Sequence, residues 1–411
     1  MQECLTTRQV AALSIMFVLC LLIVGGQRAR AQDVSPGHVL VRIQLGVDVV
    51  RLAQDYNTVV EDHVSGTDLY SLALPGGSTE AGFAAQVSAD VRVLYAEPDQ
   101  FVISPEVHGE PFHFAFDLTA QPTTYVNSVT YKQVNLGAVD AFVQTHGNSG
   151  LASGQGIVVA VLDTGAALDH PALKGHFLQG WNTIYPGMPP VDEPDGAANN
   201  EVGHGTMIAG IIARLAPQAQ IMPIRVLNGD GTGTIFDLVQ GLHYAVTHGA
   251  QVINMSFGCS ARSGALSDAL DEAETAGIVL VASAGNDNVN QPLAPAVGRG
   301  VIAVAAVEGN NAKSPYSNYG SYIRVVAPGS GIRSTFWDGG YASWSGTSFA
   351  APFVTAEAAL ILSSQPASTA ESVVSTIRKT AHSVDSSNPA YKGKLGNGII
   401  DIEAAVKAAG H

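Results

Sequence analysis

From about residue 133 onward the sequence predicts an α/β fold, a doubly wound, mostly parallel sheet with helices on both faces. Two observations predict it. Fully apolar runs of strand length, which are typical of parallel strands buried on both faces, alternate with longer stretches of helical spacing. Polar residues also stand at the ends of these runs, as in Asp163-Thr164-Gly165 after the run 157–162. The carboxyl ends of such strands line the crevice where ligands bind.

The elements expected in this region each follow from a local pattern. The helix at 206–215 carries its large apolar residues at helical spacing, and Gly249 stops the helix at 235–248. Runs rich in valine, isoleucine and alanine predict the buried strands. In chain order, the expected strands cover 157–162, 221–226, 252–256, 278–283, 301–307 and 322–327, and the expected helices cover 206–215, 235–248, 266–276 and 349–362.

The first 31 residues have the features of a secretory signal peptide. Arg8 precedes an apolar run at 10–24, and Ala29-Arg30-Ala31 supplies small residues around a cleavage point before Gln32. A membrane anchor is the alternative, but a helical span needs about 20 apolar residues, more than this run provides. We therefore expect export to the extracellular space, the periplasm or the cell surface, with no membrane span in the mature protein.

Residues 32–103 are expected to form a small α+β domain, either a binding domain or a folding aid. Alternating and helical spacings predict the order strand, helix, strand, helix, strand, at 39–43, 47–56, 68–74, 79–89 and 91–95. Prolines at 105, 111 and 122 then mark residues 104–132 as a linker, where a processing site is expected. The α/β domain follows at 133–411.

Composition excludes several classes of protein. With 46% hydrophobic and 13% charged residues the chain is not intrinsically disordered. Its 20 basic and 35 acidic residues become 17 and 34 without the signal segment, which holds three arginines and one glutamate, so the net charge is then 17 − 34 = −17. A strongly acidic protein is unsuited to nucleic acid. Cys259 is the one cysteine outside the signal segment, so no disulfide framework is expected.

Ser348 is the candidate nucleophile of this sequence. Small residues lead into it and an apolar helical run follows, so it should lie where a loop enters a helix, with Pro352 tolerated in the first turn. Unpaired backbone N–H groups at a helix start stabilise negative charge that develops beside such a serine. An ordinary helix-capping serine is the alternative for this segment taken alone.

Three further polar residues stand at element ends and supply the partners that a hydroxyl nucleophile needs. Asp163 follows a strand, His204 precedes a helix, and Asn286 follows another strand. An imidazole removes the hydroxyl proton, and a carboxylate orients that imidazole and stabilises its charged form. Asn286 would donate a side-chain N–H to an oxyanion. No His-Glu-x-x-His metal motif occurs, and the chemistry requires no metal or other cofactor.

Four segments that contain these residues closely resemble the subtilisin-like serine proteases, in that family's order of Asp, His, Asn and Ser. They are 159–165, 203–206, 284–286 and 345–352. This order and the oxyanion-hole asparagine are established features of that family. The resemblance covers roughly residues 133–408. It implies a subtilisin-like fold, and it implies that residues 32–103 are a propeptide that assists folding and inhibits the enzyme until it is removed.

The resemblance also implies a substrate cleft. Two backbone segments would receive the substrate strand between them by strand addition. A third segment would line the pocket for the residue before the scissile bond. These substrate-binding residues are Gly231, Thr232 and Gly233, then Ser256, Phe257 and Gly258, and finally Ser283, Ala284 and Gly285. A plain turn at 231–233 and a capped strand end at Ser256 are the alternatives.

The sequence departs from the family where several relatives bind calcium. Ala172 stands at the position of a calcium-ligating aspartate, so a structural calcium ion is not supported there. The acidic stretch Asp192-Glu193-Pro194-Asp195 has the oxygen ligands for a hard cation, but we interpret it as a solvated loop.

The sequence as a whole predicts a secreted serine endopeptidase that is made as a zymogen and acts on protein or peptide substrates. A catalytically inactive binding or scaffold protein with the same fold is the alternative from another class. An aspartic protease would need a second Asp-Thr-Gly or Asp-Ser-Gly sequence, which is absent. An α/β-hydrolase esterase would need an acid and then a histidine after the serine. Only the terminal His411 follows the candidate acids Asp385 and Asp401, which disfavours this class.

Overall fold

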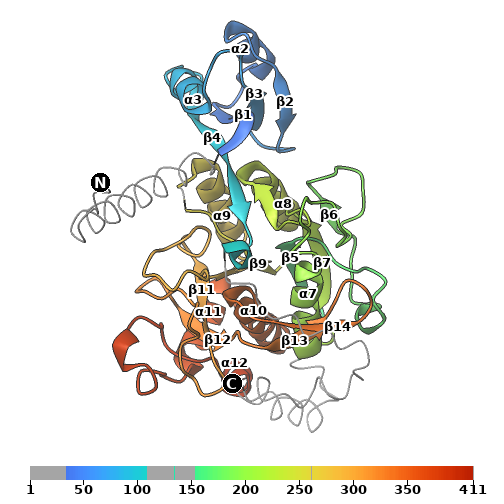
Figure 1. Cartoon of the computed structure of the whole chain (residues 1–411), viewed down its shortest axis with the longest axis vertical. Helices are drawn as coiled ribbons and strands as arrows, with labels where there is room; N and C mark the ends of the chain where they lie inside the picture. Colours follow the sequence, from blue (N-terminus) through green and yellow to red (C-terminus); the bar gives the residue numbers. More distant parts are fainter. Residues whose placement is uncertain (1–33, 109–133, 135–152, 261, 411) are drawn as a thin grey trace, which may run out of the picture. The chain divides into compact units, whose positions relative to one another are not determined.

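The computed structural model describes residues 34–108, 134, 153–260 and 262–410, which group into two compact units (Figure 1). The first unit holds residues 34–61 and 71–101, and the second holds residues 62–70 and the described residues from 102 onward. The predicted signal segment 1–31 and most of the predicted linker, 109–132, lie outside the described residues.

The first unit is a small α+β module. Its sheet has the order β2-β3-β1-β4, and β1 and β4 pair antiparallel. The predicted order of strands and helices is observed, with one addition, the short strand β2, whose last three residues are exposed and therefore lack an apolar pattern. The elements are β1 (Val34–Ile43), α2 (Val49–Asp55), β2 (Val60–His63), β3 (Leu69–Ala73), α3 (Glu80–Ser88) and β4 (Val93–Ile103).

The second unit is built on a sheet of seven parallel strands with the order β12-β11-β10-β9-β5-β7-β6. The predicted parallel α/β fold is therefore present, and the order shows that the chain reverses its direction of winding beside β5. The strands are β5 (Val158–Asp163), β6 (Trp181–Asn182), β7 (Gln220–Arg225), β9 (Val252–Met255), β10 (Val279–Ser283), β11 (Val301–Val307) and β12 (Val325–Pro328).

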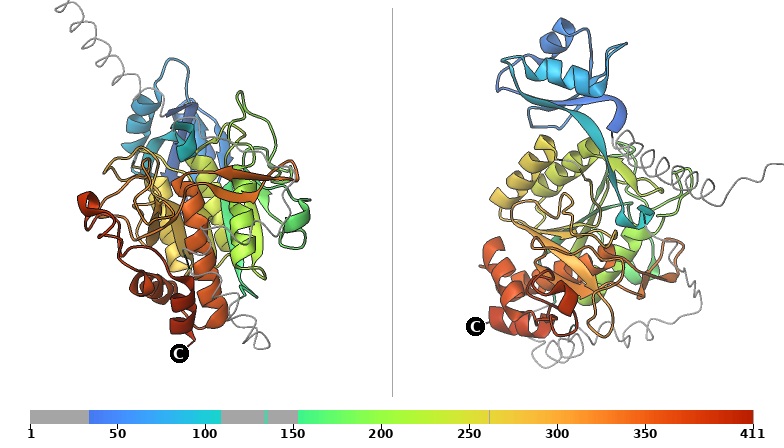
Figure 2. Two further views of the ribbon diagram at one scale, coloured as in Figure 1. Left: turned by 60° about the horizontal axis from the view of Figure 1, so that its bottom comes forward. Right: turned by 60° about the vertical axis from the view of Figure 1, so that its left-hand side comes forward.

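Helices cover both faces of this sheet (Figures 1 and 2). Val159 and Val161 of β5 share one core with α7 (His204–Leu215), α10 (Thr347–Ser364) and α12 (Ile402–Ala409). On the opposite side of β5, Leu162 lies next to α8 (Ile235–Thr247), which packs beside α9 (Gly264–Thr275). Alternate residues of one strand thus enter two cores, which explains why the strand sequences are apolar throughout.

Several elements lie outside the predicted set. The hairpin of β13 (Ile332–Thr335) and β14 (Tyr341–Trp344), the helix α11 (Ala370–Thr380) and α12 follow patterns too short or too polar to be predicted as core elements. The other described elements of this unit are η2 (Pro105–His108), η3 (Pro171–Leu173), β8 (Thr232–Thr234) and η4 (Pro389–Tyr391). Among the described residues, α10 alone has the length and hydropathy of a membrane span, and 94% of it is buried inside the protein.

Candidate active site

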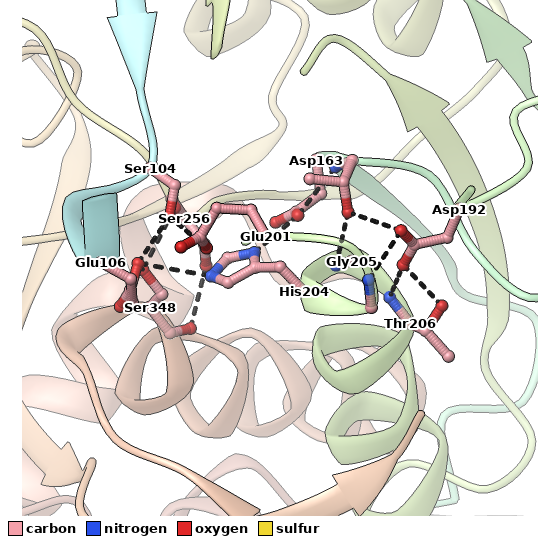
Figure 3. Close-up of polar contacts among 12 residues, drawn as sticks. Ser104, Glu106, Asp163, Asp192, Glu201, His204, Gly205, Thr206, Ser256 and Ser348 are labelled. Atoms are coloured by element: carbon pink, nitrogen blue, oxygen red, sulfur yellow. Dashed lines mark hydrogen bonds and ion pairs between the residues drawn. The ribbon is translucent and has the colours of Figure 1, made fainter. Parts of the chain in front are cut away.

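The fold brings the four predicted catalytic residues to one edge of the parallel sheet. Asp163 is the last residue of β5, and Asn286 follows β10 by three residues. His204 is the first residue of α7, and Ser348 is the second residue of α10. Because parallel strands end at the same edge, Asp163 meets the start of α7 there (Figure 3), and Asn286 meets the start of α10.

Asp163 and His204 form a buried pair. The Nδ1 atom of His204 lies 2.6 Å from Oδ1 of Asp163, and both side chains are fully buried. The approach depends on Gly205, where a Cβ atom would lie 2.2 Å from the carbonyl oxygen of Gly165. A glycine at this position therefore lets α7 begin directly against the end of β5. The pairing fixes the imidazole so that its Nε2 atom faces the side of the nucleophile.

The carboxylate of Asp192 supports this pair from behind. It accepts hydrogen bonds from the backbone N–H of Gly203 (2.8 Å) and from the backbone and hydroxyl of Thr206 (3.1 and 2.7 Å). It also accepts one from the hydroxyl of Thr164 (3.2 Å), next to Asp163. Burial raises the pKa of Asp192, and these donors oppose that rise. Our interpretation of this stretch as a solvated loop is wrong for Asp192, which is 2% exposed because it closes the helix start.

Asn286 and Ser348 are joined through Thr347. The side-chain oxygen of Asn286 accepts hydrogen bonds from the backbone N–H and from the hydroxyl of Thr347, both at 2.9 Å. This holds the amide so that its Nδ2 donor points to the same carboxylate that the Ser348 hydroxyl contacts. The backbone N–H of Ser348, in the first turn of α10, lies at the same place. The arrangement is suited to binding an oxyanion.

The carboxylate that both side chains contact belongs to Glu106. Its Oε1 atom accepts a hydrogen bond from Nδ2 of Asn286 at 2.9 Å, and its Oε2 atom accepts one from the Ser348 hydroxyl at 2.8 Å. The same Oε2 lies 3.4 Å from Nε2 of His204 (Figure 3). An acid side chain thus stands between the expected base and the expected nucleophile, with its other oxygen in the expected oxyanion position.

The residues just before Glu106 run as an extended strand along the predicted cleft. Ile103 exchanges two backbone hydrogen bonds with Gly258, at 3.1 and 2.9 Å, in an antiparallel bridge. The backbone N–H of Ser104 donates to the carbonyl of Gly231 at 2.8 Å. Two of the predicted substrate segments therefore hold a strand between them. Pro105, which has no N–H to continue the pairing, then turns the chain into η2.

The other predicted substrate residues lie around this strand. Thr232 and Gly233 form part of β8. The backbone carbonyl of Ser256 accepts a hydrogen bond from the Ser348 hydroxyl at 3.2 Å. Phe257 is fully buried in the core. The third segment, which comprises Ser283, Ala284 and Gly285, is buried as well, and the backbone N–H of Gly285 donates to the hydroxyl of Thr347 at 3.0 Å.

Electrostatics favour an ion pair between His204 and Glu106. Burial alone would lower the pKa of His204, but the charge and hydrogen bond of Asp163, together with Glu106, raise it well above 6.5. Burial likewise opposes ionisation of Glu106, but the hydrogen bond and charge of His204 and the Ser104 and Ser348 hydroxyls lower its pKa below 4.5. A protonated imidazole cannot accept the serine proton, so this arrangement is a resting one.

Glu201 completes the polar cluster. Its Oε2 atom accepts a hydrogen bond from the Ser104 hydroxyl at 3.1 Å, and the same hydroxyl donates to Glu106 at 2.7 Å. Glu106, Glu201 and His204 are the described residues with the donor types and proximity for a metal ion. Because the Glu106 oxygens already face hydroxyl, amide and imidazole donors, we interpret the cluster as a hydrogen-bonded network. Ala172, at the expected calcium position, offers no side-chain oxygen.

An acid, an imidazole, an amide and a serine at the carboxyl edge of a parallel sheet are the arrangement of a serine hydrolase. The model of the family described as "Subtilase family" matches residues 154–398. The chain therefore belongs to the subtilase family and is a subtilisin-like serine endopeptidase.

Curated relatives agree with this assignment. Subtilisin BL of Lederbergia lenta is 35% identical over 269 residues, covering 63% of this chain and 94% of that protein. Thermitase of Thermoactinomyces vulgaris is 38% identical over 256 residues, covering 60% and 88%. The thermophilic serine proteinase of Bacillus sp. (strain AK1) is 35% identical over 341 residues, covering 80% and 78%.

A solved structure agrees with the fold. Fervidolysin from Fervidobacterium pennivorans, described as a keratinolytic enzyme related to subtilisin, superposes with a TM-score of 0.73 at 24% identity. The match covers 91% of this chain and 61% of that protein. At this identity the likeness supports the subtilisin-like fold alone.

Sequence reasoning did not find Glu106, Glu201 or the buried role of Asp192. Glu106 lies in a stretch interpreted as a linker because of its prolines. Glu201 stands three residues before His204, in a turn where a carboxyl group is usually solvated. Its place beside the histidine motif was the one available signal.

Proposed function

We propose that this protein cleaves peptide bonds in proteins through Ser348, His204 and Asp163. His204 takes the hydroxyl proton of Ser348 as the oxygen attacks the peptide carbonyl carbon. Asp163 holds the imidazole in place and stabilises its positive charge. The carbonyl oxygen becomes an oxyanion, which accepts hydrogen bonds from Nδ2 of Asn286 and from the backbone at the start of α10.

The remaining steps use the same groups. His204 gives its proton to the leaving amine, the C–N bond breaks, and an acyl ester remains on Ser348. A water molecule then loses a proton to His204 and attacks the ester, which restores the serine and releases the carboxylate product. All of these reaction steps use side chains and backbone groups of the protein, and we propose that the reaction requires no cofactor.

The observation that carries this proposal is the buried pair of Asp163 and His204, whose Oδ1 and Nδ1 atoms lie 2.6 Å apart. The other ring nitrogen of His204, Nε2, faces the same small space as Ser348 and Asn286. A serine-directed phosphonate applied to the processed enzyme tests it. We expect one covalent adduct on Ser348 and loss of peptide hydrolysis. A Ser348→Ala variant that still hydrolysed peptides would exclude this mechanism, and an unlabelled, inactive wild type would favour the scaffold alternative.

We also propose that the chain is exported and made as a zymogen, with residues 32–103 as its propeptide and the processing site in the stretch 104–132 that follows. Two features support inhibition by this segment. Residues 103 and 104 occupy the strand position of a substrate, and Glu106 takes the space where the reacting carbonyl would bind. The chain turns into η2 at Pro105, and the Glu106 side chain then places its carboxylate against Nδ2 of Asn286 and the Ser348 hydroxyl.

Intact mass and N-terminal sequence of the wild type beside Ser348→Ala test the zymogen. We expect the wild type to lose its N-terminal segment and the variant to keep it, because the cut requires the nucleophile. If both lose the segment at the same rate, another protease performs the processing. If both keep it, residues 32–103 are not a removable propeptide.

A further inference from the structure

Glu201 is a buried carboxyl group in the cleft that the proposed catalytic steps do not use. Its side chain is 2% exposed. It is held from both ends of its backbone, since its N–H donates to the carbonyl of Gly229 and its carbonyl accepts from the N–H of His204, both at 3.0 Å. A group fixed this firmly next to the histidine is available to contact a bound chain.

The side chain of Glu201 forms a wall beside the Ser104 position of the cleft. A Cβ atom on Gly231 would lie 2.5 Å from Cγ of Glu201, so the glutamate packs directly against the segment that receives the bound strand. The hydroxyl of Ser104 then donates to Oε2 of Glu201 at 3.1 Å. In Figure 3 these two side chains meet on the side of His204 that faces the bound chain.

The backbone register identifies which substrate residue takes this place. Ile103 pairs with Gly258 and Ser104 donates to Gly231, so the strand is engaged up to Ser104. Pro105 then interrupts it. In a substrate that continues as an extended strand, the residue after the Ser104 position presents its carbonyl to Ser348 and Asn286. The Ser104 position therefore holds the penultimate residue, the one before the residue whose carbonyl is attacked.

Burial makes this carboxyl group selective. It raises the pKa of Glu201 to about 8, with the charge of His204 opposing the rise and that of Glu106 adding to it. A buried carboxyl group that faces an apolar side chain is left without a partner, which costs about 1–3 kcal/mol. A facing side chain that donates a hydrogen bond removes this cost, and a facing ammonium group also favours the ionised carboxylate by its charge.

We propose that Glu201 determines specificity at the penultimate substrate position, favouring side chains that donate a hydrogen bond, such as serine and lysine, over apolar side chains. The proposal rests on the proposed peptide hydrolysis at Ser348. Ser104 is the example within the chain itself, because its hydroxyl makes the contact that a substrate would make.

Matched peptides and two variants test the proposal on the processed enzyme. The peptides differ only at the penultimate residue, with Ser against Ala and Lys against Met. For the wild type we expect kcat/KM to be about tenfold higher for the Ser peptide than for the Ala peptide, because one hydrogen bond to a buried group changes kcat/KM by about this factor. Glu201→Gln keeps a hydrogen-bond acceptor and should keep the Ser preference while losing most of the Lys preference. Glu201→Leu should lose both.

Internal controls separate specificity from folding and from the proposed function. Titration with the phosphonate counts active sites, so a poorly folded variant is recognised by its count. A second peptide pair that differs at the Ile103 position should give the same ratio in all three enzymes. Equal Ser to Ala ratios in the wild type and Glu201→Leu overturn the proposal. Absence of hydrolysis of every peptide by fully folded wild type instead overturns the proposed function.

Discussion

Glu357 is an ionisable side chain inside the apolar helix α10, nine residues after Ser348. It is fully buried, and neither carboxyl oxygen has a hydrogen-bond partner among the described residues. Burial raises its pKa well above 4.5, and the charge of Asp401 adds to the rise. The folded protein therefore keeps Glu357 protonated at a pH where the unfolded chain ionises it.

This residue should make stability depend on pH. Above about pH 4.5 the unfolded state loses the proton, so folding stability falls by up to about 1.4 kcal/mol for each pH unit until the raised pKa of the folded state is reached. Glu357→Gln does not ionise and should be more stable than the parent at pH 8, with little difference at pH 4. Urea unfolding of both in a Ser348→Ala background, which prevents self-digestion, measures the difference.

Glu371 offers a matched control for this prediction, since it is an exposed glutamate in the first turn of α11. Glu371→Gln should leave the pH dependence of the unfolding free energy unchanged. A Glu357→Gln variant whose stability followed that of its parent at every pH would contradict the account.

At this scale the sequence predicted residues whose chemistry is tied to a motif. Asp163, His204, Asn286 and Ser348 each stand at the end of an apolar run, and the structure brings them together. Glu357 could not be predicted in the same way, because helical spacing indicates which residues face a core but not whether a polar one among them finds a partner.

Between elements, Asp192 joins the strand that carries Asp163 to the helix that carries His204. Its two oxygens accept four hydrogen bonds from residues 164, 203 and 206. A side chain of this kind keeps Asp163 and His204 in register, as the hydrogen-bond partners of metal ligands and of catalytic bases do in other proteins.

Replacing Asp192 by Asn should loosen this connection. Both oxygens of Asp192 accept hydrogen bonds, whereas the asparagine side chain has an NH₂ group in place of one of them. This NH₂ group would face N–H or O–H donors, so at least one hydrogen bond becomes a repulsive contact, at a cost of about 1–3 kcal/mol. We expect kcat to fall about 10- to 100-fold with KM little changed, since the substrate cleft is not altered. Steady-state kinetics, normalised by active-site titration with the phosphonate, measure this split.

Glu193→Gln is the control for the Asp192 variant. The Glu193 side chain is 52% exposed, and its Oε1 atom lies 3.4 Å from Nη1 of Arg225. It should leave both kinetic constants near those of the wild type. If Asp192→Asn raised KM and left kcat unchanged, Asp192 would act on the substrate cleft and not on the catalytic pair.

The elements that position the site were predictable to different degrees. Strands β5, β9, β10 and β11 are apolar on both faces and were predicted almost to the residue. The hairpin of β13 and β14 was not, because its strands are short and partly polar, although Trp344 at its end packs edge-on against His204 with ring centroids 5.8 Å apart. Turn-rich segments contribute to the site through contacts that local patterns do not specify.

At the scale of the second unit, the resting state is held by a short stretch of chain that precedes the sheet in sequence. The course of residues 102–106 could not be predicted, because it depends on pairing with Gly231 and Gly258, which lie more than 120 residues further along the chain. Non-local pairing of this kind leaves no mark in a local pattern.

The charge of Glu106 should govern how firmly this resting state is held. Glu106→Gln removes the ion pair with His204 while keeping a side chain of the same size. We expect the phosphonate to label Ser348 of the unprocessed variant about tenfold faster than that of the unprocessed wild type, since a charge-assisted contact contributes about 1.5–3 kcal/mol. A time series of intact masses resolves labelled full-length chain from processed enzyme, and Glu371→Gln again serves as the control.

The same ion pair gives the labelling a pH dependence whose sign follows from both partners. Glu106 has a lowered pKa in the folded state, so its contribution is present above its ordinary value of 4.5 and is lost as the pH falls through the lowered one. His204 has a raised pKa, so its contribution is present below 6.5 and is lost as the pH rises through the raised value. Protection of Ser348 should therefore be greatest between these limits and weaken on either side. Equal protection of wild type and Glu106→Gln across this range would show that the backbone pairing of residues 103 and 104 alone holds the cleft closed.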